Sequence, residues 1–175
     1  MLAAWSLLLY FLSPEEIATS LGAENAYLLL AILACIGGTS LFFPFPYYLF
    51  TITFGAAGLN PLLLGLAAGT GTLLGDTTSY YIALRGRAYV PERITTRVIR
   101  IIEWSESKHP ALLPLFALLY TSLMPLPEDI LMMAAGVAKY PFSRLAPVVW
   151  CGKIIFNTIL ALAGWYGWSF ILNLV

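Results

Sequence analysis

Long apolar runs that stop at prolines are the feature that most constrains how this chain can fold. They cover four stretches: Leu28–Phe43, Leu62–Leu74, Ala111–Met124 and Leu145–Trp168. The chain is 60% hydrophobic and 10% charged, whereas soluble domains carry about 25% charged residues. Some runs approach the ~20 residues that a membrane-spanning helix needs, and the shorter ones end at proline. The pattern predicts an all-α, polytopic membrane protein with one domain over residues 1–175.

An internal repeat appears when the sequence is shifted by 81 residues, the separation of Pro44 and Pro125. Helix breakers and buried polar positions then coincide in order: Pro44 with Pro125, Pro46 with Pro127, Gly55 with Gly136, Gly71 with Gly152, and Asp76 with Asn157. Proline interrupts a helix, and broken backbone inside a membrane must be covered by protein or trapped water. Each copy, about 26–84 and about 110–168, is therefore expected to form a re-entrant helical hairpin followed by a spanning helix. A pair of proline-kinked spanning helices is the alternative.

The basic residues predict the orientation of the chain, because basic loops stay in the cytoplasm. Most of them lie in the polar loop 85–109, which is therefore expected to be cytoplasmic. The two hairpins would then enter from opposite sides, an inverted repeat typical of secondary transporters. Within the loop, Arg93, Arg97 and Arg100 lie on one helical face. Ile94, Val98, Ile101 and Ile102 lie on another, which predicts an amphipathic helix in the headgroup layer. The segment Met1–Leu12 is too short to span upright, and an interfacial position is an option for it.

Three acids interrupt the apolar sequence: Asp76, Glu128 and Asp129. A charge at the centre of a membrane helix costs ~2.5–3.5 kcal/mol on insertion scales, so such acids are functional candidates. Glu128 and Asp129 follow the second proline pair, where the free N–H groups of a half-helix favour anions. Adjacent carboxylates repel each other, which suits one of them for proton exchange. Capping of the return helix is the alternative for this pair. For Asp76, the hydroxyls of residues 77–80 are the alternative explanation, and Arg144 or Lys153 are the expected cationic partners.

Other features exclude several classes of protein. The net charge is zero, so nucleic-acid binding is not expected. Cys35 and Cys151 are isolated and His109 is the only histidine, so neither a metal site nor another cofactor is expected. Both cysteines are predicted to be small buried residues.

The sequence between residues 30 and 160 resembles the DedA family, also called the VTT or SNARE-associated membrane domain. The first half of that family typically reads Pro-x-Pro, an apolar return, and Gly-x-x-x-Gly-Asp-x-x-x-Tyr, then a basic end. The matching positions are Pro44, Pro46, Gly55, Gly71, Gly75, Asp76, Tyr80 and Arg85 to Arg87. In the second half they are Pro125, Gly136, Phe142 and Gly152. Two departures are clear: Tyr47 and Tyr48 replace a usual glutamate, and Glu128 and Asp129 replace a usual arginine.

The resemblance implies a lipid translocase. Bacterial relatives are associated with moving undecaprenyl phosphate, dependent on proton-motive force, and eukaryotic relatives scramble phospholipids. We therefore expect a non-enzymatic, multi-pass transporter of the cell membrane that moves lipid or a polyprenyl-phosphate carrier. Protons would be exchanged by Glu128, Asp129 and Asp76. Headgroups would be bound by Arg85, Arg87, Arg144 and Lys153.

The expected partners are membrane lipids, anionic or phosphate-bearing, and a homo-oligomer is compatible with this interpretation. A small-solute or ion secondary transporter is the alternative, because it would use the same architecture. An intramembrane aspartyl protease using Asp76 and Asp129 is a remote alternative, since TLLGDT lacks the Gly-x-Gly-Asp spacing of that class.

Overall fold

The structure is a computed structural model that describes residues 22–39, 46–109, 111–123 and 129–172, together with positions 16, 19 and 20. Every regular element in these ranges is a helix, which confirms the predicted all-α class. In chain order the elements are α3 (Ala23–Thr39), α4 (Tyr47–Ala56), α5 (Pro61–Gly86), η1 (Arg87–Tyr89), α6 (Glu92–Lys108), α7 (Leu112–Leu123), α8 (Asp129–Val137) and α9 (Phe142–Leu172).

Local sequence explains where the central helix begins. The side-chain oxygen of Asn60 accepts hydrogen bonds from the backbone N–H groups of Leu62 and Leu63, at 2.9 and 3.3 Å. Asparagine is a preferred N-cap, and the proline that follows it occupies the first helical position, where no N–H is needed. Gly58, in the turn before it, has φ +82°, a conformation that glycine adopts without strain.

The predicted proline breaks fall at the ends of helices or outside the described residues. Pro46 lies directly before α4, as expected for a break. Pro44, Pro125 and Pro127 lie outside the part of the chain that the structure describes.

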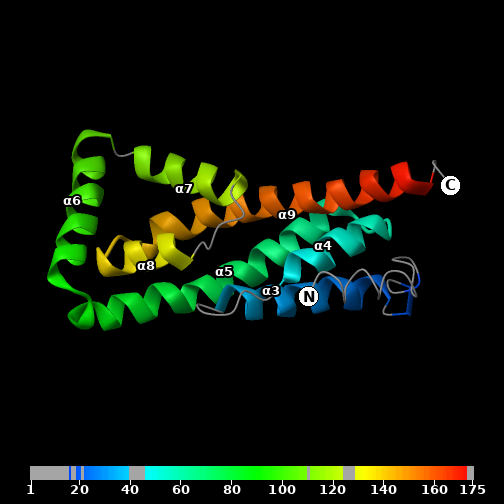
Figure 1. Cartoon of the computed structure of the whole chain (residues 1–175), viewed down its shortest axis with the longest axis horizontal. Helices are drawn as coiled ribbons and strands as arrows, with labels where there is room; N and C mark the ends of the chain where they lie inside the picture. Colours follow the sequence, from blue (N-terminus) through cyan, green and yellow to red (C-terminus); the bar gives the residue numbers. More distant parts are fainter. Residues whose placement is uncertain are drawn as a thin grey trace.

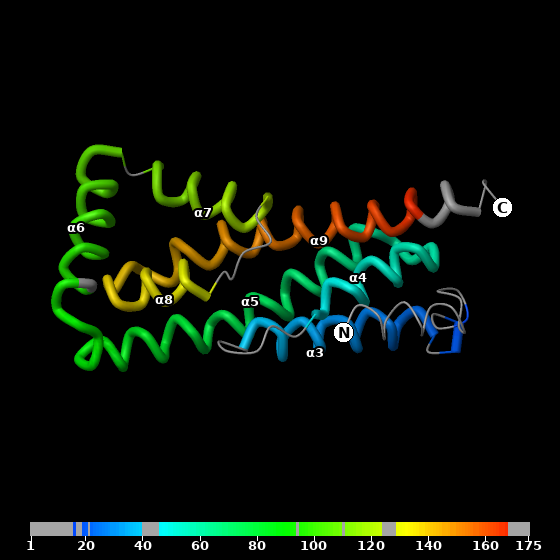
Figure 2. Tube along the Cα trace, in the orientation of Figure 1, coloured from blue at the N-terminus to red at the C-terminus, as the bar shows by residue number. Residues whose placement is uncertain are grey.

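The two longest helices, α5 and α9, run antiparallel through the centre of an elongated bundle (Figure 1). One half of the bundle holds α3, which packs along α5, and α4, which packs along α9. The other half holds α7, which packs along α9, and α8, which packs along α5. The path of the chain shows α3 running towards the middle of the bundle and α4 returning to the same end (Figure 2). From the opposite end, α7 runs in and α8 returns (Figure 2).

Helix lengths separate the elements into two groups. With 10 and 9 residues, α4 and α8 are about 15 Å and 14 Å long, roughly half of the ~30 Å hydrocarbon layer. With 26 residues, α5 is about 39 Å long. Among the described residues, one segment, Phe142–Gly167, is both long and apolar enough to cross a membrane. The helices α3 and α7 are apolar but shorter.

Glycines allow the short helices to touch the long ones. A side chain at Gly55 would collide with the backbone carbonyl of Ala161, and one at Gly136 would collide with the carbonyl of Tyr80. The 81-residue shift seen in the sequence relates Gly55 to Gly136 and Tyr80 to Ala161, so the two contacts correspond to each other. The short helices α4 and α8 therefore contact the long helices at corresponding positions.

The apolar core consists of two clusters, one in each half of the bundle. The first involves α3, α4 and parts of α5 and α9, and includes Leu30, Phe54, Leu64, Ala68 and Ala161. The second involves α6, α7, α8 and the other parts of α5 and α9, and includes Tyr80, Ile102, Met132, Leu145 and Val149. Along both long helices, the stretch between the clusters carries buried polar side chains: Thr72, Asp76, Lys153 and Asn157.

The helix α6 lies across one end of the bundle (Figure 1). A helix was predicted in this loop and is present, and its position in the headgroup layer stays a prediction. Ile102 is buried against the bundle and Val98 packs beside it, whereas Ile101 is 65% exposed. Neighbouring residues of a helix are 100° apart, so only one of the two isoleucines can face the core. Cys151 is also exposed, contrary to the prediction of a buried cysteine.

Candidate functional site

The centre of the candidate site is an ion pair between the two long helices. The Nζ atom of Lys153 on α9 lies 2.7 Å from Oδ2 of Asp76 on α5, and both side chains are almost completely buried. Gly69 makes the approach possible, because a side chain there would press against Ile154, the neighbour of Lys153. Removing two charges from water is expensive, and an apolar pair often stabilises a protein as well as a buried ion pair does. Burial in an apolar bundle therefore marks this pair as a functional candidate.

Two neutral polar side chains accompany the pair. Thr72 lies one turn before Asp76, and Asn157 lies one turn after Lys153; both are buried. The side-chain amide of Asn157 donates to the carbonyl of Lys153 at 2.9 Å, while its buried Oδ1 has no hydrogen-bond partner among the described residues. The 81-residue shift relates Asp76 to Asn157 and Thr72 to Lys153.

A second acid contacts α5 one turn away from the ion pair. Asp129 is the first residue of α8, and its Oδ1 accepts a hydrogen bond from the hydroxyl of Ser79 at 2.7 Å. Ser79 follows Asp76 by three residues, which places both on the same side of α5. In the described part of the chain, the bond of this carboxylate goes to another helix and not to an amide of α8. Glu128, its predicted partner, lies outside the described residues.

The predicted alternative for Asp76, satisfaction by the hydroxyls that follow it, is wrong. Thr77 and Thr78 donate to carbonyls of their own helix, those of Leu73 and Gly75. Ser79 donates to Asp129, and Tyr80 donates to the carbonyl of Tyr140 at 2.7 Å. Lys153 is the partner of Asp76 instead. The two acids Asp76 and Asp129 thus have different polar partners, and neither partner is the other acid.

The predicted headgroup residues fall into two places. Lys153 is buried at the centre, whereas Arg85 lies in the last turn of α5, Arg87 in η1 and Arg144 in the first turn of α9. These ends of the two long helices lie beside α6 (Figure 1). Arg144 forms an exposed ion pair with Glu106 of α6 at 3.3 Å. At this end, burial raises the pKa of Tyr140 above its ordinary value of 10.0; Glu106 adds to the rise and Arg144 opposes it.

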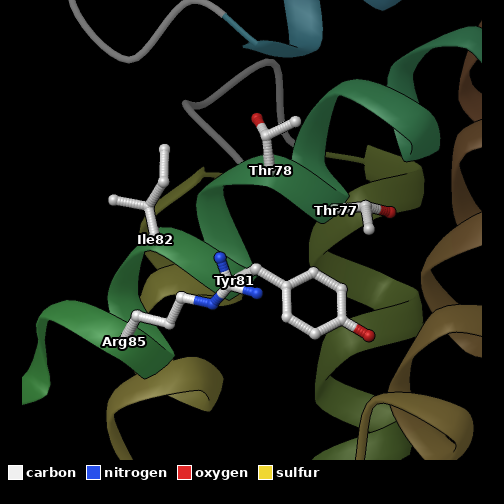
Figure 3. A pocket seen from close by; sticks show the side chains of 5 residues that line it. All are labelled: Thr77, Thr78, Tyr81, Ile82 and Arg85. Carbon is white, nitrogen blue, oxygen red and sulfur yellow. The ribbon is translucent and has the colours of Figure 1, made fainter.

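A groove runs along the outer face of α5 and ends at Arg85. It has a volume of about 360 Å³ and is lined by Thr77, Thr78, Tyr81, Ile82 and Arg85. All of these side chains come from successive turns of one helix (Figure 3). The side chains of Tyr81 and Ile82 are 44% and 55% exposed. They form an exposed surface next to the guanidinium of Arg85.

Comparison with protein families places the chain in a known family. Residues 45–166 match the VTT domain, which is the domain of the DedA family. The chain belongs to the VTT-domain family. This confirms the resemblance seen in the sequence. Comparison with curated proteins and with solved structures gives no match.

Membership of the VTT-domain family has consequences for the class of protein. VTT-domain proteins are associated with membranes and are generally thought to be transporters or flippases without enzymatic activity. The matched region begins just before α4 and ends within α9. It therefore contains both acids with described contacts, the buried lysine, the groove and α6.

The sequence predicted neither the bond between Ser79 and Asp129 nor the groove on α5. The two partners of this bond are 50 residues apart, so no local pattern in the sequence indicates it. The pairing of Asp76 with Lys153 had a signal in the sequence. Asp76 lies four residues after Thr72 on the first long helix, and Lys153 lies four residues before Asn157 on the second. The 81-residue repeat places these two helices at equivalent positions.

Proposed function

We propose that this VTT-domain protein is a multi-pass transporter that moves a phosphate-bearing lipid between the leaflets of the cell membrane, linked to protons. The observation that carries the proposal is the buried ion pair of Asp76 and Lys153 between α5 and α9. Ionisable groups inside a membrane bundle are expensive, and they mark substrate or proton pathways by default.

An inverted repeat is part of this proposal. The corresponding contacts of Gly55 with Ala161 and of Gly136 with Tyr80 support it. The antiparallel α5 and α9 also meet where Gly65 faces Thr158 and Gly69 faces Ile154. Two residues after Gly69 on α5 and two residues before Ile154 on α9, the positions at the same level are Gly71 and Gly152. The 81-residue shift relates these two glycines to each other. An approximate two-fold axis at this level would pass beside the buried ion pair, as in transporters whose sites lie between broken helices.

The same arrangement supports a position across the membrane. At about 39 Å, α5 exceeds the hydrocarbon thickness of ~30 Å. The α6 end, with its arginines, would face the cytoplasm under the positive-inside rule. The pairs α3–α4 and α7–α8 would then be the two re-entrant hairpins, entering from opposite sides.

The groove on α5 offers a place for a lipid. An acyl chain would lie against Tyr81 and Ile82, and the phosphate of the lipid would meet the guanidinium of Arg85, with Arg87 in η1 and Arg144 in the first turn of α9 as further cations. Guanidinium groups bind phosphate with paired, charge-assisted hydrogen bonds. The exposed side chains of Tyr81 and Ile82 beside Arg85 support a lipid better than a free solute in this groove.

Glu128 and Asp129 would exchange protons as α8 moves against α5. In the present arrangement, Asp129 is bonded to Ser79, which fixes α8 beside the ion pair. Protonation of Asp129 would weaken this charge-assisted bond and release the start of α8.

Transport in proteoliposomes tests the proposal. The double variant Glu128→Gln with Asp129→Asn keeps side-chain shape and removes both charges. Lipid translocation driven by a pH gradient should fall roughly 5- to 150-fold, the range of ordinary coupling free energies. The matched control, Glu92→Gln with Glu103→Gln, changes two exposed acids of α6 and should transport normally. If the first variant moves lipid at the wild-type rate under the gradient, the proton-linked function is wrong.

A further inference from the structure

We propose that the buried ion pair is an exchange site, in which the phosphate of the lipid replaces the carboxylate of Asp76 as the partner of Lys153. As the phosphate arrives, Asp76 takes up one proton from the aqueous side. This inference rests on the proposed function and names its substrate class: a lipid whose phosphate carries a single negative charge.

Charge balance is the reason for the exchange. In the structure, the ammonium of Lys153 is neutralised by Asp76 within an apolar bundle. A phosphate brought to Lys153 would add a second anion beside Asp76, and an uncompensated buried charge is strongly unfavourable. Protonation of Asp76 restores neutrality, because one ammonium then faces one phosphate and one neutral carboxylic acid. No covalent bond forms or breaks, and the proton leaves again when the phosphate leaves.

Few ionisable side chains besides Lys153 face Asp76 from the helices packed around it. The helices packed along α5 are α3, α8 and α9, with α4 contacting it more weakly. Their ionisable side chains near this level are Cys35 of α3, Asp129 of α8 and Lys153 of α9, with Tyr80 on α5 itself. Cys35 is half-buried on α3, and the hydroxyl of Tyr80 donates to the carbonyl of Tyr140. Asp129 contacts Ser79.

The other cations of the long helices lie elsewhere. Arg85 and Arg87 are at the end of α5, and Arg144 is in the first turn of α9, where it pairs with Glu106. Arg85 is nine residues beyond Asp76, about 13 Å along the helix axis. Lys153 is therefore the cation positioned to receive a phosphate at the centre, and Asp76 is the group positioned to release it.

The position of the pair suits alternating access. On one side α8 covers α5 through the contact of Gly136 with Tyr80, and on the other side α4 covers α9 through the contact of Gly55 with Ala161. Movement of either short helix would open the buried pair from one end of the bundle. Since the pair is almost completely buried here, the structure corresponds to the closed arrangement of the exchange.

Binding and proton uptake, measured together on the full-length protein in detergent, test the exchange. Dihexanoyl phosphatidylglycerol is the probe, and calorimetry in buffers of different ionisation enthalpy reports the protons. The wild type should take up about one proton per bound lipid. Asp76→Asn should bind at least as tightly, without proton uptake. Lys153→Gln should bind roughly ten- to a hundredfold more weakly, as expected for loss of a charge-assisted bond.

Matched variants control for surface charge and for folding. Lys139→Gln removes an exposed lysine in the turn after α8 and should bind like the wild type. Each single change at the pair leaves one buried charge uncompensated, so Asp76→Asn combined with Lys153→Gln is the neutral reference. It should fold and bind as weakly as Lys153→Gln alone. Normal binding by this double variant, or its failure to fold, would overturn the exchange site. So would wild-type binding without proton uptake.

Inorganic phosphate separates a lipid site from a site for free phosphate. It should bind more weakly than the lipid probe, because it has no acyl chain whose apolar surface can be buried; equal affinity would overturn the lipid assignment. Translocation assays separate this inference from the proposed function. Proton-linked binding without translocation would refute the function and leave the exchange site standing. Translocation that is unaffected in Lys153→Gln would refute the exchange site alone.

Discussion

At the residue scale, Gly55 and Gly136 each allow a short helix to touch the backbone of a long helix, one in each half of the molecule. A methyl group at Gly55 would strike the carbonyl of Ala161, and one at Gly136 would strike that of Tyr80. Because both obstacles are backbone, no side-chain rotation relieves them. We expect Gly55→Ala and Gly136→Ala each to lower the free energy of unfolding by ~1–3 kcal/mol, measured by denaturation in detergent. Gly86→Ala is the control, since nothing lies near its position, and should change stability by less than ~0.5 kcal/mol. A large difference between the first two variants would contradict the repeat.

At the element scale, α6 offers a direct test of which face meets the bundle. Ile102 is 8% exposed and packs in the second core cluster, while its neighbour Ile101 is 65% exposed. We expect Ile102→Ala to cost about 2 kcal/mol or more of unfolding free energy, because a buried isoleucine leaves a cavity. Ile101→Ala should be nearly neutral. Hydrogen exchange of the α6 amides would report the same difference locally. Equal effects would contradict docking of α6 on the bundle through Ile102.

At the scale of the whole molecule, the proposed topology places the α6 end and the α3–α4 end on opposite sides of the membrane. Thr96 is exposed on α6, and Ala23 is exposed at the start of α3. In a background without Cys35 and Cys151, Thr96→Cys should react with an impermeant maleimide from the cytoplasmic side. Ala23→Cys should react only from the other side. Labelling of both cysteines from one side would exclude a bundle that crosses the membrane in this way.

The sequence by itself determined the family and the helical class of this protein, together with several boundaries. Apolar composition and the VTT pattern are properties of the chain that need no folding to be read. Asn60 and Pro61 start α5 through local hydrogen bonding and a fixed φ. Pro46 stands at the start of α4 for an equally local reason, because proline lacks the N–H that a preceding helix would need.

Only the tertiary structure decided which polar groups meet. For Asp76 the sequence left neighbouring hydroxyls, Arg144 and Lys153 as candidate partners, and the packing of α5 against α9 selects Lys153. Asp129, a plausible cap of its own helix, bonds to Ser79. Which face of α6 is covered, and hence the difference between Ile101 and Ile102, was also outside the reach of periodicity. Local chemistry fixes where a helix begins or breaks, whereas partners depend on how far each helix slides and rotates against its neighbours. In this protein those variables are set by close contacts at glycines, between segments distant in the sequence.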